Sequence, residues 1–130
     1  QRIVFGKPLI YQPVIRQKLA KMVEEVESVY HWVEFITYQM TQMSHREQAL
    51  KLAGPISLLK QYCTDVSYRI SDCACQIFGG RAVTKTGMGK YIEKFQRSIK
   101  YGSILGGASE VMGDLGVKMA AKSFPKRAKL

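Results

Sequence analysis

Two long stripes of apolar residues constrain the fold of this chain more than any other feature of its sequence. In each stripe the apolar residues follow one another at alternating steps of four and three, which places them on one face of an α-helix. The first stripe consists of Ile15, Leu19, Met22, Val26, Val29, Val33, Ile36, Met40 and Met43. The second consists of Leu52, Ile56, Leu59, Cys63, Val66, Ile70, Cys73 and Ile77. Because a repeat of about 3.5 residues favours left-handed packing between similar helices, we expect these two helices to face each other.

Local signals place the boundaries of these two helices. Pro13 suits a first helical position, where its missing N–H and fixed φ cost nothing, so it begins the first helix. Ser44 and Glu47 have the spacing of a capping box, which indicates a helix start after the first stripe. Pro55 either lies in the first turn of the second long helix, with residues 44–53 forming a short separate helix, or kinks one continuous helix. We favour the first alternative.

Two shorter helices are predicted after the second stripe. One extends over about 88–102 and carries Ile92, Phe95 and Ile99 on one face. The other extends over about 109–122 and carries Val111, Leu115 and Met119. The hydroxyl of Ser109 can accept a hydrogen bond from a first-turn N–H, which makes Ser109 the expected N-cap of this helix.

The expected fold is an all-α antiparallel four-helix bundle in one domain, residues 1–130. Strand signals are weak and confined to 2–5 and 81–84. We expect residues 1–12 to form a lead-in loop and 123–130 to form a basic tail. The 130 residues are too few for two domains, and the apolar runs are too short to cross a bilayer. The first residues lack the features of a signal peptide and an initiator methionine, so we expect a fragment of a longer chain.

The sequence does not predict a metal site. Cys63, Cys73 and Cys75 lack the C-x-x-C spacing of metal and redox sites, and their odd number suits buried thiols in a reducing compartment. His31 and His45 are expected to stand alone, without a carboxylate or cysteine partner at ligand spacing.

Three glycine-containing corners interrupt the helical pattern. Gly79 and Gly80 end the second long helix, where a glycine in the αL conformation is a common helix terminator. Gly106 and Gly107 precede the last helix, whose exposed N–H groups favour anions. Phe5-Gly6-Lys7 precedes the first helix. Each corner offers main chain that a cofactor or substrate could approach closely.

At these corners the sequence resembles a known family. The stretches RIVFGKPL at 2–9, QIFGG at 76–80 and IEKFQRSIKYGSILGGASEVM at 92–112 are similar to the C-terminal helical domain of acyl-CoA dehydrogenases. The resemblance covers the chain from Arg2 to about Ala121. It implies a flavoenzyme with FAD as cofactor, an acyl-CoA as substrate, a homo-oligomeric assembly, and a protein carrier or oxygen as electron acceptor.

The resemblance also implies which residues meet the cofactor. The implied FAD contacts are Arg2, Phe5, Leu9, Gln12, Gln76, Ile77, Phe78, Gly79, Gly80, Ala108, Ser109 and Glu110. In the family the arginine lies at the pyrophosphate across a subunit interface, and the diglycine turn lies against the adenosine half of an FAD held mainly by the neighbouring subunit. The segment 108–110 would meet the flavin of its own subunit, and the substrate thioester would lie beside Gly106 and Gly107.

The family removes the α-proton of an acyl-CoA with a glutamate while a hydride leaves the β-carbon for the flavin, giving a trans-2-enoyl-CoA. Many members carry that glutamate where this chain has Gly106, and glycine cannot act as a base. Some members supply the glutamate from a preceding helix, which here would lie before Gln1. The chain is therefore expected to hold no catalytic base and to be inactive alone. The N–H groups near Gly106 and Gly107 could support the thioester oxygen.

This chain departs from the family pattern at two further positions. Ala108 replaces the usual threonine, whose hydroxyl would bond the flavin or cap the helix. Ser98, after Arg97, replaces the usual aspartate. Glu110 is the carboxylate within the motif, but its position matches a flavin contact, so we do not assign it as the base.

The net charge of +10 favours anionic partners, for which the phosphates of FAD and CoA suffice. A nucleic-acid-associated flavoprotein of the same superfamily ranks second, because the basic residues are spread along the chain. An acyl-CoA oxidase-like enzyme and a non-catalytic helical interaction module are further alternatives. The final Ala-Lys-Leu fits a peroxisomal signal, ahead of a mitochondrial or cytoplasmic location.

Overall fold

The computed structural model describes residues 2–122 and 124. Its elements are β1 (Ile3–Val4), β2 (Lys7–Pro8), the 3₁₀ helix η1 (Leu9–Tyr11), α1 (Pro13–Thr41), α2 (His45–Lys51), α3 (Ala53–Phe78), the 3₁₀ helix η2 (Gly79–Val83), α4 (Gly89–Ile104) and α5 (Ser109–Lys122). The all-α prediction is confirmed. The Ala-Lys-Leu sequence at 128–130 lies outside the described residues.

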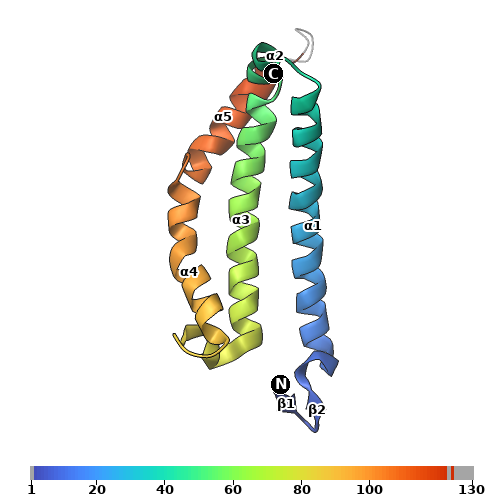
Figure 1. The fold of residues 1–130 in the computed structure, drawn as a ribbon, viewed down its shortest axis with the longest axis vertical. Coiled ribbons are helices and arrows are strands. Elements are labelled where there is room, and N and C mark those ends of the chain that lie inside the picture. Colours follow the sequence, from blue (N-terminus) through green and yellow to red (C-terminus); the bar gives the residue numbers. More distant parts are fainter. Residues whose placement is uncertain (1, 123, 125–130) are drawn as a thin grey trace.

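The helices form an antiparallel array with α3 in the middle (Figure 1). Helix α1 runs along one side of α3, and α4 and α5 follow each other along the other side, both antiparallel to α3. The four longer helices therefore make three columns. In the part of the chain that is described, no helix combines the length and the apolar character needed to cross a membrane.

The predicted helix boundaries agree closely with the structure. Helix α1 begins at Pro13. The Ser44 hydroxyl accepts a hydrogen bond from the N–H of Glu47 at 3.4 Å, and the N–H of Ser44 donates to the Glu47 carboxylate at 3.1 Å, so the capping box is confirmed. Pro55 lies in the first turn of α3, after the short separate helix α2.

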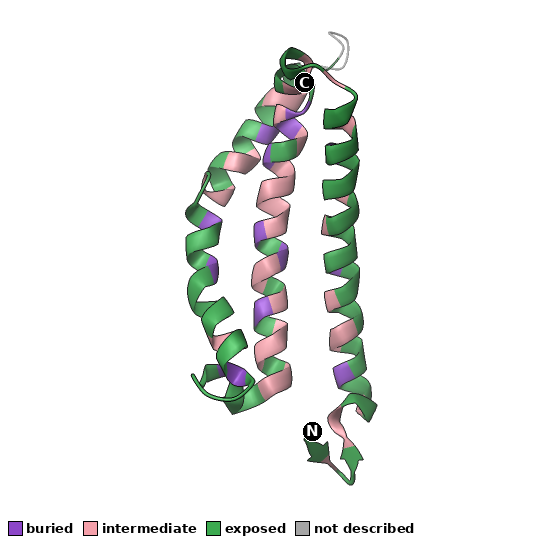
Figure 2. Cartoon of the chain, in the orientation of Figure 1, coloured by how far each residue is buried: buried purple, intermediate pink, exposed green. Residues whose placement is uncertain are grey.

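The apolar stripe of α1 is only partly buried. Ile15 and Ile36 are buried, as is Val66 on the facing side of α3. Val26 and Val33 remain 49% and 44% exposed, although the repeat predicts that they face a neighbour. These valines stay exposed because α3 is the main neighbour of α1. Helices α4 and α5 lie on the far side of α3 and do not cover α1 (Figure 2).

An ion pair between a buried carboxylate and a half-exposed guanidinium joins α1 to α3. The Glu25 side chain is buried on α1, and the Nε of Arg69 on α3 donates to its carboxylate at 2.7 Å. Removing one member of such a pair leaves the other without its partner, which costs more than the pair contributes. The pair therefore fixes the register between the two long helices.

Helix α5 packs on α3 through glycines rather than through its apolar stripe. Gly116 is buried, whereas Val111 and Leu115 of the predicted stripe are 60% and 41% exposed, so the predicted packing face of α5 holds only at Met119, which is half-buried beside Gly54. A Cβ on Gly116 would collide with the Leu58 side chain, and a Cβ on Gly54 would lie 3.1 Å from the carbonyl of Gly116. The two backbones approach too closely for side chains between them.

Residues 2–12 form more regular structure than the predicted lead-in loop. Strands β1 and β2 form an antiparallel hairpin that η1 connects to α1. Phe5 and Gly6 have φ angles of +51° and +71°, as a type I′ hairpin turn requires. The Gln12 side chain donates to a carbonyl of β1 at 3.1 Å and ties the hairpin to the start of α1. The second strand signal, 81–84, lies mostly in η2.

We expect Gly116→Ala to destabilise the chain by about 1–3 kcal/mol, because overpacking outweighs the better helix propensity of alanine. Gly102→Ala on α4 is the matched control, because a Cβ there meets open space. The control is expected to stabilise by up to about 1 kcal/mol. Urea titrations followed by circular dichroism measure both changes. Equal stabilisation by the two substitutions would contradict the close backbone contact.

The capping box makes the stability of α2 dependent on pH. Hydrogen bonds from the Ser44 N–H and hydroxyl, together with Lys51, lower the pKa of Glu47 from 4.5 to about 2. Because this pKa is lower in the folded state, the ionised Glu47 carboxylate stabilises the fold fully above pH 4.5. This stabilisation is lost as the pH falls through about 2. We expect Ser44→Ala to raise the pKa of Glu47 in an NMR titration. Ser28→Ala, which removes only a bond to Glu24, should leave it unchanged.

Candidate functional site

We number the three family-like stretches in chain order: RIVFGKPL at 2–9 is the first motif, QIFGG at 76–80 the second, and 92–112 the third. The first two motifs meet in one pocket at the end of the molecule that carries the hairpin. The pocket has a volume of about 380 Å³. Its lining residues are Arg2, Pro8, Leu9, Ile10, Ile77, Phe78, Arg81 and Met88. Segments more than 60 positions apart in the sequence thus form one surface, and Arg2, Leu9, Ile77 and Phe78 are predicted site residues that the structure brings together.

Two guanidinium groups give this pocket its chemistry. Arg2 reaches the diglycine corner, where its Nη1 lies 3.7 Å from the place that a Cβ on Gly79 would occupy. The guanidinium carbon of Arg81 lies 5.8 Å from the centre of the Phe78 ring. Two planar cations beside apolar side chains suit a ligand that combines an anionic group with an aromatic ring system. Sequence reasoning missed Arg81, although its place directly after Gly80 was a usable signal.

The diglycine corner ends α3, but not in the predicted αL conformation. Gly79 has φ +60° and ψ −146°, a combination that only glycine adopts readily. Its N–H donates to the carbonyl of Cys75. Gly80 is exposed, and a Cβ built on it would have no atom within 4 Å. The fold itself therefore explains why residue 79 is glycine, and leaves an open approach to the main chain at residue 80.

The remaining predicted residues at this end differ in their exposure. Phe5 is 91% exposed at the tip of the hairpin, and its positive φ is a strained conformation for a residue with a side chain. Gln76 is exposed on the last turn of α3. Gln12 is half-buried, and its amide nitrogen already donates to the hairpin, so it holds the pocket wall in place.

The third motif forms the corner between α4 and α5. Gly106 and Gly107 have φ angles of +74° and +121°. The carbonyl of Ala108 accepts the first helical hydrogen bond of α5, from Met112 at 2.9 Å. Ala108 is therefore the N-cap and Ser109 the first helical residue, which corrects the predicted N-cap. Glu110 follows in the first turn and is exposed.

The hydrogen bonds at this corner distinguish its two glycines. The N–H of Gly107 donates to the carbonyl of Ile104 at 3.2 Å, and the carbonyl of Gly107 accepts from the ammonium of Lys60. Within the described residues, the main chain of Gly106 forms no hydrogen bond, and a Cβ on it would meet open space. Sequence reasoning missed Lys60, because its partners lie more than 40 positions away and no local pattern marks it.

The two groups of predicted site residues lie apart within one copy of the chain. The pocket with Arg2 and Phe78 lies where α3 ends, whereas the corner between α4 and α5 lies beside α3, partway along its length (Figure 1). The structure therefore brings the first two motifs together and leaves the third separate.

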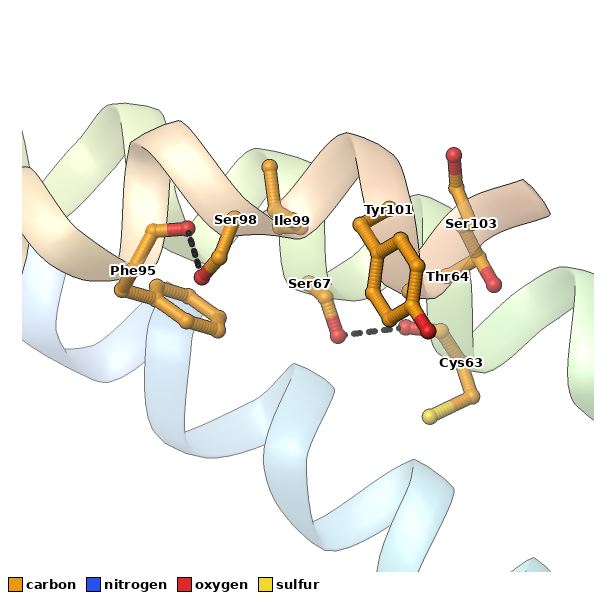
Figure 3. A pocket seen from close by; sticks show the side chains of 9 residues that line it. Cys63, Thr64, Ser67, Phe95, Ser98, Ile99, Tyr101 and Ser103 are labelled. Atoms are coloured by element: carbon orange, nitrogen blue, oxygen red, sulfur yellow. Dashed lines mark hydrogen bonds between the residues drawn. The ribbon is translucent and has the colours of Figure 1, made fainter. Parts of the chain in front are cut away.

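A second pocket lies between α3 and α4 and is largely apolar. Phe95 and Tyr101 of α4 border it opposite Cys63 and Ser67 of α3 (Figure 3). The Ser67 hydroxyl donates to the carbonyl of Cys63 at 2.8 Å, so this polar group is satisfied within α3. Among the described residues, no charged side chain lines the pocket. It offers a largely apolar packing surface.

Basic residues gather on α4 and on the segment before it. Lys85, Lys90 and Lys94 line one shallow surface, whereas the expectation was a basic character spread along the chain. Arg97 on the same surface donates to Glu93 at 2.8 Å, and this hydrogen bond lowers the pKa of the carboxyl. The three lysines leave the surface positively charged.

The cysteine and histidine expectations need correction. All three cysteines are half-buried rather than buried, and burial raises the pKa of Cys75. His31 does not stand alone, because carboxylate oxygens of Glu27 and Glu34 lie 3.6 Å and 3.3 Å from its ring nitrogens. This exposed group lies on one face of α1. Across residues 2–122 and 124, no cluster of three such side chains has the arrangement of a metal site.

Comparison with known proteins gives one consistent result. Residues 1–120 match the family model described as acyl-CoA dehydrogenase, C-terminal domain. No solved structure matches the chain significantly. The family match covers the pocket, the diglycine corner and the α4–α5 corner together.

The curated relatives are full-length proteins of which this chain spans about 30%. The acyl-CoA dehydrogenase apdG of Emericella nidulans is 33% identical over 129 residues, which cover 99% of this chain and 30% of the relative. The probable acyl-CoA dehydrogenase YdiO of Escherichia coli is 31% identical over 112 residues, covering 86% and 27%. An acyl-CoA dehydrogenase of Bacillus subtilis is 29% identical over 111 residues, covering 85% and 27%.

Proposed function

The chain belongs to the acyl-CoA dehydrogenase family, as a C-terminal domain of that family, and we propose that it forms part of the FAD and substrate sites of an enzyme that desaturates an acyl-CoA between its α- and β-carbons. One observation carries the cofactor part of this proposal. The pocket that joins the first and second motifs places two guanidinium groups beside apolar side chains, and the unobstructed main chain of Gly80 directly precedes its lining residue Arg81.

The residues at this end fit a dinucleotide. Arg2 and Arg81 would hold the pyrophosphate by charge-assisted hydrogen bonds, and Phe78 with its apolar neighbours would pack against a ring of the ligand. The bare main chain at Gly80 would allow close approach. FAD, when bound, supplies a two-electron acceptor for the reaction. The exposed ring of Phe5, held on a strained turn, would be covered in the assembled enzyme.

The α4–α5 corner would receive the substrate thioester. Gly106 cannot act as a base, so the glutamate that removes the α-proton would come from a helix outside this chain. The N–H of Gly107 already donates to Ile104. The N–H of Gly106 is therefore the better candidate to support the thioester oxygen as negative charge develops on it. Ser109 and Glu110, at the start of α5, would contact the flavin.

The separation of the two surfaces favours a cofactor shared between subunits. Within one copy, the pocket lies at the end of α3, at Ile77 and Phe78, whereas the α4–α5 corner lies beside Lys60, near the other end of that helix. A homo-oligomer would let one FAD contact the corner of one subunit and the pocket of another. The exposed apolar side chains of α1 and α4, such as Val26 and Phe95, would be covered by the rest of such an assembly.

The location and the partners are also proposals. The Ala-Lys-Leu sequence at 128–130 supports import into peroxisomes, and the electron acceptor would be a protein carrier or oxygen. The lysines on α4 keep nucleic acid as the competing partner. If the whole protein bound duplex nucleic acid with strong salt dependence and acted on no acyl-CoA, nucleic acid would replace acyl-CoA as the favoured partner.

The function is tested on the protein that carries this chain, purified with its upstream segment. We expect bound flavin, visible in the absorption spectrum, that an acyl-CoA bleaches under anaerobic conditions. Mass spectrometry should detect the enoyl-CoA product, and the isolated chain should neither bleach flavin nor form product. A folded, colourless protein that takes up no added FAD would refute the proposal.

Gly80→Ala tests the cofactor pocket separately from the fold. The substitution leaves the fold intact, because residue 80 has open space around it, yet the added methyl group should weaken FAD binding in the full-length protein by about tenfold. Gly102→Ala, also in open space but away from the pocket, should leave FAD affinity unchanged. Equal FAD affinities in both variants would show that residue 80 does not touch the cofactor.

A further inference from the structure

Lys60 makes two hydrogen bonds that connect distant parts of the chain. It lies on α3, half-buried, and its ammonium donates to the carbonyl of Ser103 at 2.8 Å and to the carbonyl of Gly107. These partners lie 43 and 47 positions further along the chain. One side chain in the central helix thus holds both the end of α4 and the diglycine corner after it.

The two carbonyls are groups that need a donor. The last carbonyls of a helix have no partner within the helix, and Ser103 lies in the last turn of α4. A cation at this end also opposes the negative pole of the helix dipole. Gly107 lies in a backbone conformation that leaves its carbonyl outside the helical pattern. Lys60 therefore supplies donors where α4 and the corner lack them.

The corner is held at Gly107 from three directions. Lys60 binds its carbonyl, Ile104 accepts its N–H at 3.2 Å, and Met112 of α5 packs so closely that a Cβ on Gly107 would collide with its sulfur atom. The adjoining Gly106 has neither hydrogen bonds nor near neighbours within the described residues. The main chain of Gly107 is therefore held in place, whereas that of Gly106 faces open space.

We propose that Lys60 is a positioning residue that fixes the Gly107 carbonyl and thereby sets the direction in which the Gly106 main chain faces the substrate thioester. The proposal rests on the proposed function for its link to substrate. Its structural part, the anchoring of the corner, stands independently of any cofactor. Lys60 touches no reacting atom in this account. It acts through the two carbonyls that it holds.

Lys60→Met tests the anchoring, because methionine keeps most of the length and apolar character of the lysine stem but has no donor. We expect hydrogen exchange in peptides spanning 104–112 to become at least about tenfold faster, since a hydrogen bond to a charged group is lost. Peptides from α1 should be unchanged. Lys51→Met, which removes an exposed lysine on α2, is the matched control and should leave 104–112 unchanged.

Lys60→Arg keeps a charged donor and should restore slow exchange in part. If Lys60→Met does not fold, Lys60→Leu, which also lacks a donor, provides the same comparison. Unchanged exchange at 104–112 in the folded variant would overturn the anchoring.

The link to substrate is measured in the flavin-loaded full-length protein. We expect Lys60→Met to lower kcat by about tenfold with a smaller change in KM, because a misplaced corner loses stabilisation in the transition state rather than substrate binding. FAD content should fall much less than kcat, since the pocket at Arg2 lies outside the loosened corner and would still hold the cofactor. Faster exchange with unaltered kcat would overturn the link to substrate. Failure of all flavin and acyl-CoA assays in the parent protein would instead count against the proposed function.

Discussion

The arrangement of the whole chain depends on α3, which holds each neighbour by a different physical contact. An ion pair between Arg69 and the buried Glu25 fixes α1. Direct backbone contact at Gly54 fixes α5, and the ammonium of Lys60 fixes the end of α4. None of these contacts is a broad apolar interface. Each is specific in geometry, so each fixes a register that apolar packing alone would leave free to slide.

This mode of packing leaves much apolar surface uncovered. Helix α1 has one main neighbour, so Val26 and Val33 of its stripe remain largely exposed, and Phe95 on α4 is 43% exposed. Exposed apolar side chains that lie together on a soluble protein often mark an interaction surface. Further chain segments or subunits packed on these apolar faces, as proposed above, would account for the exposure of the side chains. They would also account for the separation of the predicted site residues, which lie at the end of α3 and at the α4–α5 corner partway along it.

The features that the sequence predicted are those that local chemistry determines. Pro13, the Ser44–Glu47 capping box and Pro55 act within a few residues of themselves, and all three predictions are confirmed. The packing face of α5 was predicted correctly at Met119 but not at Val111 and Leu115. Periodicity locates apolar side chains, whereas the close backbone contact at Gly116 requires that no side chain be present. Lys60 could not be found for a related reason. The carbonyl groups that Lys60 contacts lie more than 40 positions away in the sequence, so no neighbouring residue distinguishes this lysine from one exposed to solvent.

The α4–α5 corner shows why such a remote cation is needed. Positive φ angles at two successive residues exclude ordinary side chains, which would be strained by about 1–3 kcal/mol each. Glycine removes that strain but loses more conformational freedom on folding than other residues. A diglycine corner is therefore disordered unless tertiary contacts offset this entropy. At Gly107 those contacts exist, through Lys60, Ile104 and Met112. Order at one glycine thus allows its neighbour, Gly106, to stay bare and accessible without the corner losing its shape.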